Sequence, residues 1–142
     1  MSLRESGDSL DRLVAELERF ERDGPDRALR AMRGAGDSLI REGFDRSRAP
    51  SGVPWRPLKR GPSKRRPGRR PLVKTGALRA WASHGVIVGS SATWDTSRVG
   101  AFHQLGTSRM PARPFLPPGR LPLVWGLRIA HAAESALPGF SL

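Results

Sequence analysis

A basic segment that prolines interrupt every few residues limits the fold of this 142-residue chain more than any other feature. Six prolines fall between residues 50 and 71, and each removes a backbone donor and fixes φ, so a long helix or a central strand is excluded there. The same part of the chain supplies the net charge of +12, because twelve basic and no acidic residues lie between Asp45 and Asp95. Elsewhere the chain holds thirteen residues of each sign. We therefore expect a long basic loop over residues 45–71, called the basic segment below, on a nearly neutral body.

The sequence on either side of this segment predicts a single α+β domain. Residues 8–44 are expected to form an antiparallel helical hairpin, because apolar residues recur at helical spacing on both sides of Gly24-Pro25. Residues 72–116 are expected to form a short helix followed by a small antiparallel sheet. A C-terminal helix is expected within residues 120–138.

Details within residues 72–116 can be tested separately. Leu78 and Trp81 are expected to face inward from the short helix. Residues 84–89 contain a β-branched run and predict a strand. Residues 99–105 are apolar and fit either a strand or a helix. Residues 110–116 contain two prolines, so a strand there has to lie at a sheet edge.

The sequence contains no pattern typical of an active site, a metal centre or a membrane span. It has no cysteine, and its histidines (His84, His103 and His131) lack the i, i+4 spacing of a helical zinc site. Asp95 and Glu134 stand alone, so no carboxylate pair for acid–base chemistry is evident. No run of about eighteen apolar residues is present. We expect no catalytic residue, no bound metal or cofactor, no enzymatic activity and no membrane partner.

The basic segment is the candidate contact with a negatively charged partner. Trp55 and Leu58 are its large apolar side chains, and we expect them to anchor it to the body. Two interpretations remain for the charges: they bind nucleic acid or the acidic surface of a protein, or they form a solvated loop that keeps the protein soluble. The candidate contact residues are Arg56, Lys59, Arg60, Lys64, Arg65, Arg66, Arg69 and Arg70.

An ordered set of short strings carries a resemblance to a known family. The strings are Phe44 with Pro50–Leu58, then Leu72–Arg79, then Val88-Gly89-Ser90, His103–Gly106 and Met110–Leu116. Their order and spacing over residues 44–116 resemble the virion morphogenesis, or tail completion, family of tailed phages, including Mu-like ones. The chain departs from the family pattern at Ser51, where an acidic residue is usual, and at residues 99–101, where a Tyr-Ala pair is usual.

The resemblance implies a structural virion protein that completes the tail and joins it to the head at the neck. Related neck proteins form rings, commonly of six subunits, around the DNA channel. A hexameric homo-oligomer is therefore implied, with other neck, connector and tail tube proteins as neighbours and packaged DNA as a further candidate partner. Assembly would take place in the host cytoplasm, and the final location would be the virion.

Two hypotheses about the site follow from this assignment. Arg113 and Phe115, within the Pro111–Leu116 stretch, are candidates for a docking edge. Arg113 is equally interpretable as a local cap on loop carbonyls. The alternative function is that of a general nucleic-acid-binding protein that uses the basic segment.

Overall fold

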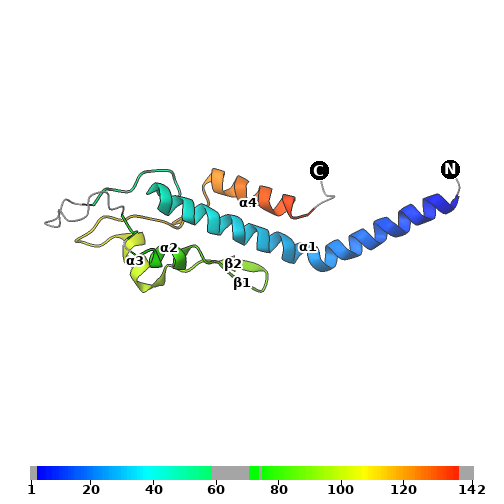
Figure 1. The fold of residues 1–142 in the computed structure, drawn as a ribbon, viewed down its shortest axis with the longest axis horizontal. Helices are drawn as coiled ribbons and strands as arrows, with labels where there is room; N and C mark the ends of the chain where they lie inside the picture. Colours follow the sequence, from blue (N-terminus) through cyan, green and yellow to red (C-terminus); the bar gives the residue numbers. More distant parts are fainter. Residues whose placement is uncertain (1–2, 59–70, 74, 138–142) are drawn as a thin grey trace.

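The computed structural model describes residues 3–58, 71–73 and 75–137 and confirms the α+β class (Figure 1). Its elements are α1 (Leu3–Arg46), α2 (Ala77–Ala82), β1 (Val86–Val88), β2 (Ser91–Thr93), α3 (Ser97–Leu105) and α4 (Leu123–Ser135). The second half of α1 is the centre of the body: α4 packs along one side of it, and α2 and the two strands pack along the other. The first half of α1 extends away from the body.

Residues 8–44 belong to one continuous helix, so the predicted helical hairpin is wrong. Pro25 lies inside α1, where it removes one hydrogen bond of the helix, and Figure 1 shows that the two halves of α1 differ in direction. Gly24-Pro25 therefore bends the helix without reversing it. The position beside residues 26–44 that the hairpin would have given to residues 8–23 is taken by α4.

A two-residue turn at Gly89-Ser90 joins β1 and β2 into an antiparallel hairpin, which confirms the strand expected at residues 84–89. The paired residues are Val86 with Thr93, Ile87 with Ala92, and Val88 with Ser91. The small antiparallel sheet therefore consists of these two strands within the described part of the chain.

Three local predictions around this sheet had different outcomes. The stretch 99–105, which fitted either a strand or a helix, is helical and lies within α3. Residues 110–116 contain no strand; the amides of Phe115 and Leu116 donate to the Gln104 side chain, and the Arg113 amide donates to the His103 carbonyl. The short helix α2 is present, and Leu78 packs against the core. Trp81 is 57% exposed, however, so the prediction that it faces inward is wrong.

A buried carboxylate fastens the β hairpin to α1. Asp37 Oδ1 accepts hydrogen bonds from the Gly85 amide and from Trp94 Nε1, each at 2.8 Å. The Trp94 ring lies so close to Gly36 and Gly85 that a Cβ at either position would collide with it. These glycines therefore permit the hairpin to approach the helix, and Asp37 holds it there.

Candidate functional site

An aromatic cluster in the core holds the start of the basic segment. Trp55 packs edge-on against Phe44, with ring centroids 5.5 Å apart and an interplanar angle of 83°. Phe115 packs against the same Phe44 ring at a centroid distance of 5.3 Å. The indole Nε1 of Trp55 also donates a hydrogen bond to the Pro114 carbonyl at 2.8 Å. Trp55 thus fixes the segment to the body, whereas Leu58 is 42% exposed and does not belong to this cluster.

Gln104 of α3 fixes the neighbouring chain segment by its side-chain amide. Its Nε2 donates to the Leu116 carbonyl at 2.7 Å. Its Oε1 accepts from the amides of Phe115 and Leu116 at 2.9 and 3.1 Å. This side chain therefore satisfies three backbone groups that no strand partner satisfies, and it holds Phe115 under Phe44.

Arg113 and Phe115 lie in the interior, so the docking-edge prediction is wrong for both side chains. Their exposed fractions are 6% and 2%, respectively. The guanidinium of Arg113 donates from Nε to the Arg56 carbonyl at 2.9 Å and from Nη2 to the Pro57 carbonyl at 3.2 Å. Arg113 is thus a cap on loop carbonyls, and it ties residues 56–57 to the same cluster that holds Trp55.

His103 is half-buried beside this cap. Its Nδ1 has no hydrogen-bond partner among the described residues, and its carbonyl accepts the Arg113 amide at 2.8 Å. Burial, reinforced by the positive charge of Arg113, lowers the pKa of His103 below its ordinary value. The imidazole is therefore neutral at neutral pH. Its surroundings suit a packed side chain.

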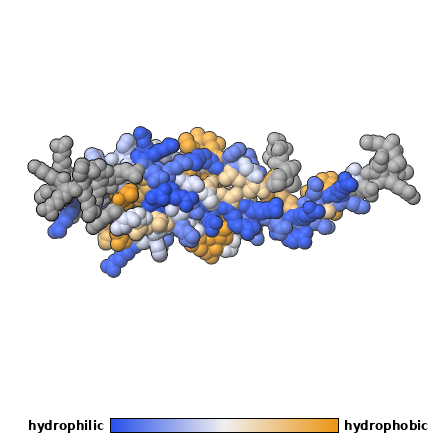
Figure 2. All heavy atoms as spheres, in the orientation of Figure 1, coloured by the Kyte–Doolittle hydropathy of each residue, from blue (hydrophilic) through white to orange (hydrophobic). Residues whose placement is uncertain are grey.

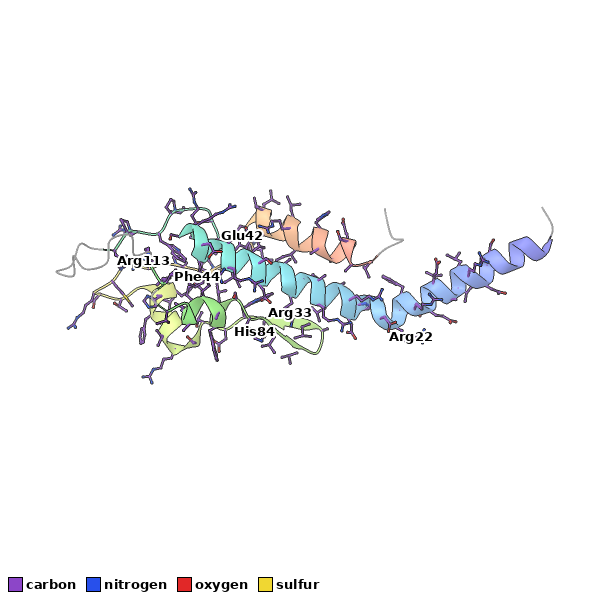
Figure 3. All side chains as sticks on the ribbon, in the orientation of Figure 1. Arg22, Arg33, Glu42, Phe44, His84 and Arg113 are labelled. Carbon is purple, nitrogen blue, oxygen red and sulfur yellow. The ribbon has the colours of Figure 1, made fainter. Side chains whose placement is uncertain are left out.

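The structure describes one of the eight basic residues that we predicted to contact a partner. Arg56 lies at the start of the basic segment with its side chain exposed. Figure 3 places Phe44 and Arg113 at this end of the body, far from Arg22 on the projecting half of α1. The other seven fall outside the described residues: Lys59, Arg60, Lys64, Arg65, Arg66, Arg69 and Arg70.

A groove lies at the same end of the body, between the end of α1, residues 48–52 and the start of α4. We call it the α1/α4 groove; its volume is about 440 Å³. The buried side chains of Leu39 and Trp125 contribute to its lining. Leu123 and Val124, in the first turn of α4, also line it and are largely exposed. The groove therefore offers apolar surface to a partner.

Arginines line the α1/α4 groove. Arg46 and Arg48 are exposed, and Arg48 donates a hydrogen bond to the Gly52 carbonyl at 3.2 Å. Glu42 is the one acidic residue among the lining residues. Arg128 forms an ion pair with it and donates two hydrogen bonds, of 2.7 and 2.8 Å, to its carboxylate. The bond from Arg128 lowers the pKa of Glu42, and the bond to Glu42 raises the pKa of Arg128. The groove consequently presents a positive edge.

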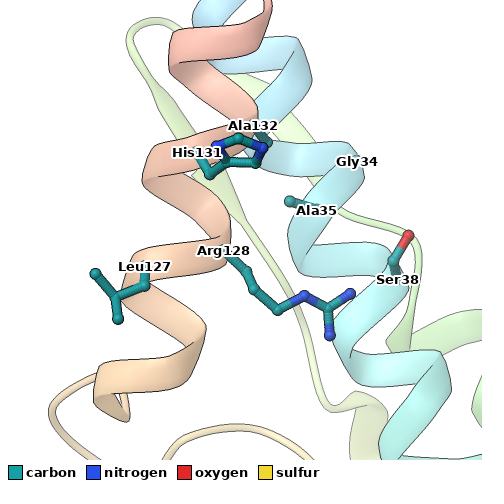
Figure 4. A pocket seen from close by; sticks show the side chains of 7 residues that line it. All are labelled: Gly34, Ala35, Ser38, Leu127, Arg128, His131 and Ala132. Atoms are coloured by element: carbon teal, nitrogen blue, oxygen red, sulfur yellow. The ribbon is translucent and has the colours of Figure 1, made fainter.

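A second hollow of about 430 Å³ continues between the same two helices and shares Arg128 with the groove (Figure 4). Small residues of α1, namely Gly34, Ala35 and Ser38, form one wall. Leu127, which is exposed, and Ala132 belong to the α4 side. The two hollows thus follow the contact between the helices, and the Arg128–Glu42 pair lies where they meet.

The projecting half of α1 carries a second apolar surface, at the other end of the molecule. Four exposed side chains share one side of the helix at i, i+3, i+4 and i+7 spacing. We call them the α1 stripe: Leu10, Leu13, Val14 and Leu17. Figure 2 shows apolar surface on the projection as well as on the body. The expected helical hairpin would have placed these side chains in its interior.

Apolar side chains are also exposed on α3 and beside the β hairpin. Val99, Phe102 and Leu105 of α3 point outward. A hollow of about 680 Å³ lies beside Trp81 and Trp94. His84 and Asp95 are among its other lining residues, but a single imidazole and a single carboxylate are a weak basis for catalysis.

The described residues bear on two features, a metal site and a membrane-spanning helix. No three His, Cys, Asp or Glu side chains among the described residues come together in a way that could hold a metal ion. None of the helices over residues 3–58, 71–73 and 75–137 combines the length and the apolar character needed to cross a bilayer. Comparison with protein-family models, with curated proteins and with solved structures gave no match.

Proposed function

We propose that this chain is a non-enzymatic structural protein of a tailed-phage virion that completes the tail and joins it to the head at the neck. The observation that carries the proposal is that residues of the family-like strings converge in space. Five residues from three of the strings, which are far apart in sequence, form one packed and hydrogen-bonded cluster: Phe44, Trp55, Gln104, Arg113 and Phe115. Such convergence favours a shared folding signature over a set of chance matches.

The exposed surfaces of the subunit support an oligomer. Apolar side chains remain exposed on the α1 stripe and in the α1/α4 groove, and patches of this kind mark sites of protein association. We propose a ring, hexameric as in the family resemblance, around the DNA channel. Its neighbours would be other neck, connector and tail tube proteins.

The basic segment supplies the second contact of the proposed ring. Its start is fixed to the body, because Trp55 bonds to Pro114 and Arg113 bonds to the Arg56 carbonyl. Copies arranged around a channel would stack these charges into a positive collar. The collar would contact the packaged DNA or the acidic wall of a neighbouring tail protein.

Deletion of the gene from the phage genome that, on this proposal, encodes the chain tests the function. Electron microscopy of the lysates is expected to show DNA-filled heads and finished tails that are not joined, or tails of irregular length. Intact virions in normal numbers would contradict the proposal.

Complementation of the deletion tests the basic segment separately. A variant with six bases replaced by alanine (Arg60, Lys64, Arg65, Arg66, Arg69 and Arg70) is expected to fail in assembly. A matched control removes the same charge from exposed arginines elsewhere: Arg27, Arg30, Arg41, Arg98, Arg109 and Arg120. The control is expected to assemble. If both variants assemble as well as the wild type, the segment does not have the proposed role.

The concentration of charge also favours a second candidate, a general nucleic-acid-binding protein. That candidate predicts tight DNA binding by the isolated subunit, with log affinity falling by about 0.9 per log unit of salt for each phosphate engaged. The neck proposal predicts weak binding until the subunits assemble. DNA binding by the purified chain at two salt concentrations separates the two candidates.

A further inference from the structure

We propose that the α1 stripe of one copy docks in the α1/α4 groove of a second copy, in a head-to-tail contact. The inference rests on the proposed function, because it names the contact between neighbouring subunits of the ring. The stripe and the groove lie toward opposite ends of the molecule (Figure 1). One subunit can therefore use both surfaces at once, each with a different neighbour.

Acidic residues border the α1 stripe on both sides. At 3.6 residues per turn, Asp11 and Glu18 follow one edge of the stripe and Glu16 follows the other, whereas Arg12 and Arg19 lie on the opposite side of the helix. Residues 1–23 contain seven acidic and four basic residues. The projecting half of α1 is thus an apolar helix face framed by negative charge.

The α1/α4 groove has the complementary character. Residues 24–142 contain twenty-one basic and six acidic residues, so the body is strongly positive. Arg46 and Arg48 are exposed beside the exposed Leu123 and Val124, and the nearby Glu42 is already paired. The first turn of α4 contains no acidic residue, and a helix N-terminus favours nearby negative charge. An amphipathic helix in a groove is a recurrent mode of recognition, and here its charges match.

The same charges disfavour the pairing of two stripes with each other. In either relative direction, such a pair would bring the carboxylates that frame one stripe against those that frame the other, and like charges across a helix pair oppose association. A second copy therefore binds through its body and not through its own stripe. Because the two surfaces differ, the contact is heterologous, and its repetition closes a ring when the rotation between neighbours closes.

The dimensions are compatible with this contact. The helix from Leu10 to Asp23 is about 20 Å long at 1.5 Å per residue. The groove of about 440 Å³ and the hollow of about 430 Å³ follow one another along the contact between α1 and α4, with Arg128 between them. One helix laid on one groove is a small interface, so we expect moderate affinity for a pair and cooperative closure of a ring.

Two variants and their mixture test the contact by size-exclusion chromatography with light scattering on the full chain. The stripe variant is Leu13→Lys with Leu17→Lys, and the groove variant is Leu123→Glu with Val124→Glu; all four side chains are exposed, so the fold should tolerate the changes. Each variant alone is expected to be monomeric at about 50 µM, where the wild type associates. The mixture is expected to form a one-to-one dimer, because one intact stripe meets one intact groove.

Each outcome of this experiment decides the inference. A groove variant that associates like the wild type would overturn it and indicate pairing of stripes. A wild type that stays monomeric at 50 µM and low salt would also overturn it and indicate that the stripe binds a different protein. The control Val99→Glu with Phe102→Glu, on the exposed face of α3, is expected to associate like the wild type. Circular dichroism confirms that every variant keeps its helices.

The contact and the neck function can fail separately. If the mixture behaves as expected but deletion of the gene leaves virions intact, the contact stands and the neck role falls. If deletion leaves heads and tails unjoined but the variants associate normally, the role stands and this contact is overturned.

Discussion

Replacement of Gln104 by alanine is expected to destabilise the fold by about 3 kcal/mol, the sum of three hydrogen bonds that each contribute on the order of 1 kcal/mol. The three bonds run to the Leu116 carbonyl and to the amides of Phe115 and Leu116, at 2.7, 2.9 and 3.1 Å. The backbone groups they satisfy are partly buried, so water replaces the lost bonds only in part. For a domain whose total stability is about 5–15 kcal/mol, this loss is large.

Two matched variants separate the hydrogen bonds from the packing of the same side chain. Gln104→Met keeps the length of the side chain but makes none of the bonds, so it should lose nearly as much as alanine. Gln104→Glu keeps the acceptor for Phe115 and Leu116 but loses the donor to the Leu116 carbonyl, so an intermediate loss is expected. Arg98→Ala, at an exposed position of the same helix, should change stability by less than about 0.5 kcal/mol.

Urea unfolding followed by tryptophan fluorescence measures these differences, because the chain has four tryptophans and no tyrosine. The midpoint should shift while the m-value stays constant. A loss of less than about 0.5 kcal/mol for Gln104→Ala, or wild-type stability for Gln104→Met, would refute the reasoning that this amide holds residues 115–116 in place.

Other predictions concern neighbouring parts of the fold. Trp55→Phe should cost about 1 kcal/mol through the lost bond to Pro114, and Trp55→Ala about 3–5 kcal/mol with faster proteolytic cleavage near residue 55. Because the pKa of His103 is lowered by folding, the unfolded chain takes up its proton first as the pH falls through about 6.5. Thermal stability should therefore decrease from pH 7.5 to 5.5, and His103→Gln should reduce that decrease. Arg128→Ala, which breaks a half-exposed pair with Glu42, should cost less than about 1 kcal/mol in urea unfolding.

The sequence was sufficient to locate most secondary structure, because the signals are local. Apolar periodicity identified the helical character of residues 8–44 and of α4, and the β-branched run identified β1. The hairpin turn predicted at Gly24-Pro25 was wrong, because a proline can either end a helix or bend it. The choice between these depended on α4, which is about one hundred residues away in sequence and covers the second half of α1.

The site was less predictable, because its contacts join distant residues. The sequence identified Trp55 as an anchor of the basic segment, but the partner of its indole, the Pro114 carbonyl, is 59 residues away. Arg113 was open between a cap and an interface, and only the positions of Arg56 and Pro57 decide it. The α1/α4 groove has no sequence signal of its own, since it arises where two helices and a turn meet.

Cryo-electron microscopy of the head–tail junction of the virion tests the central claim most directly. We predict a ring of copies of this chain at the neck, with the projecting half of α1 from each copy seated on the body of its neighbour. A junction whose density is fully accounted for by other proteins, with no copy of this fold, would contradict the account.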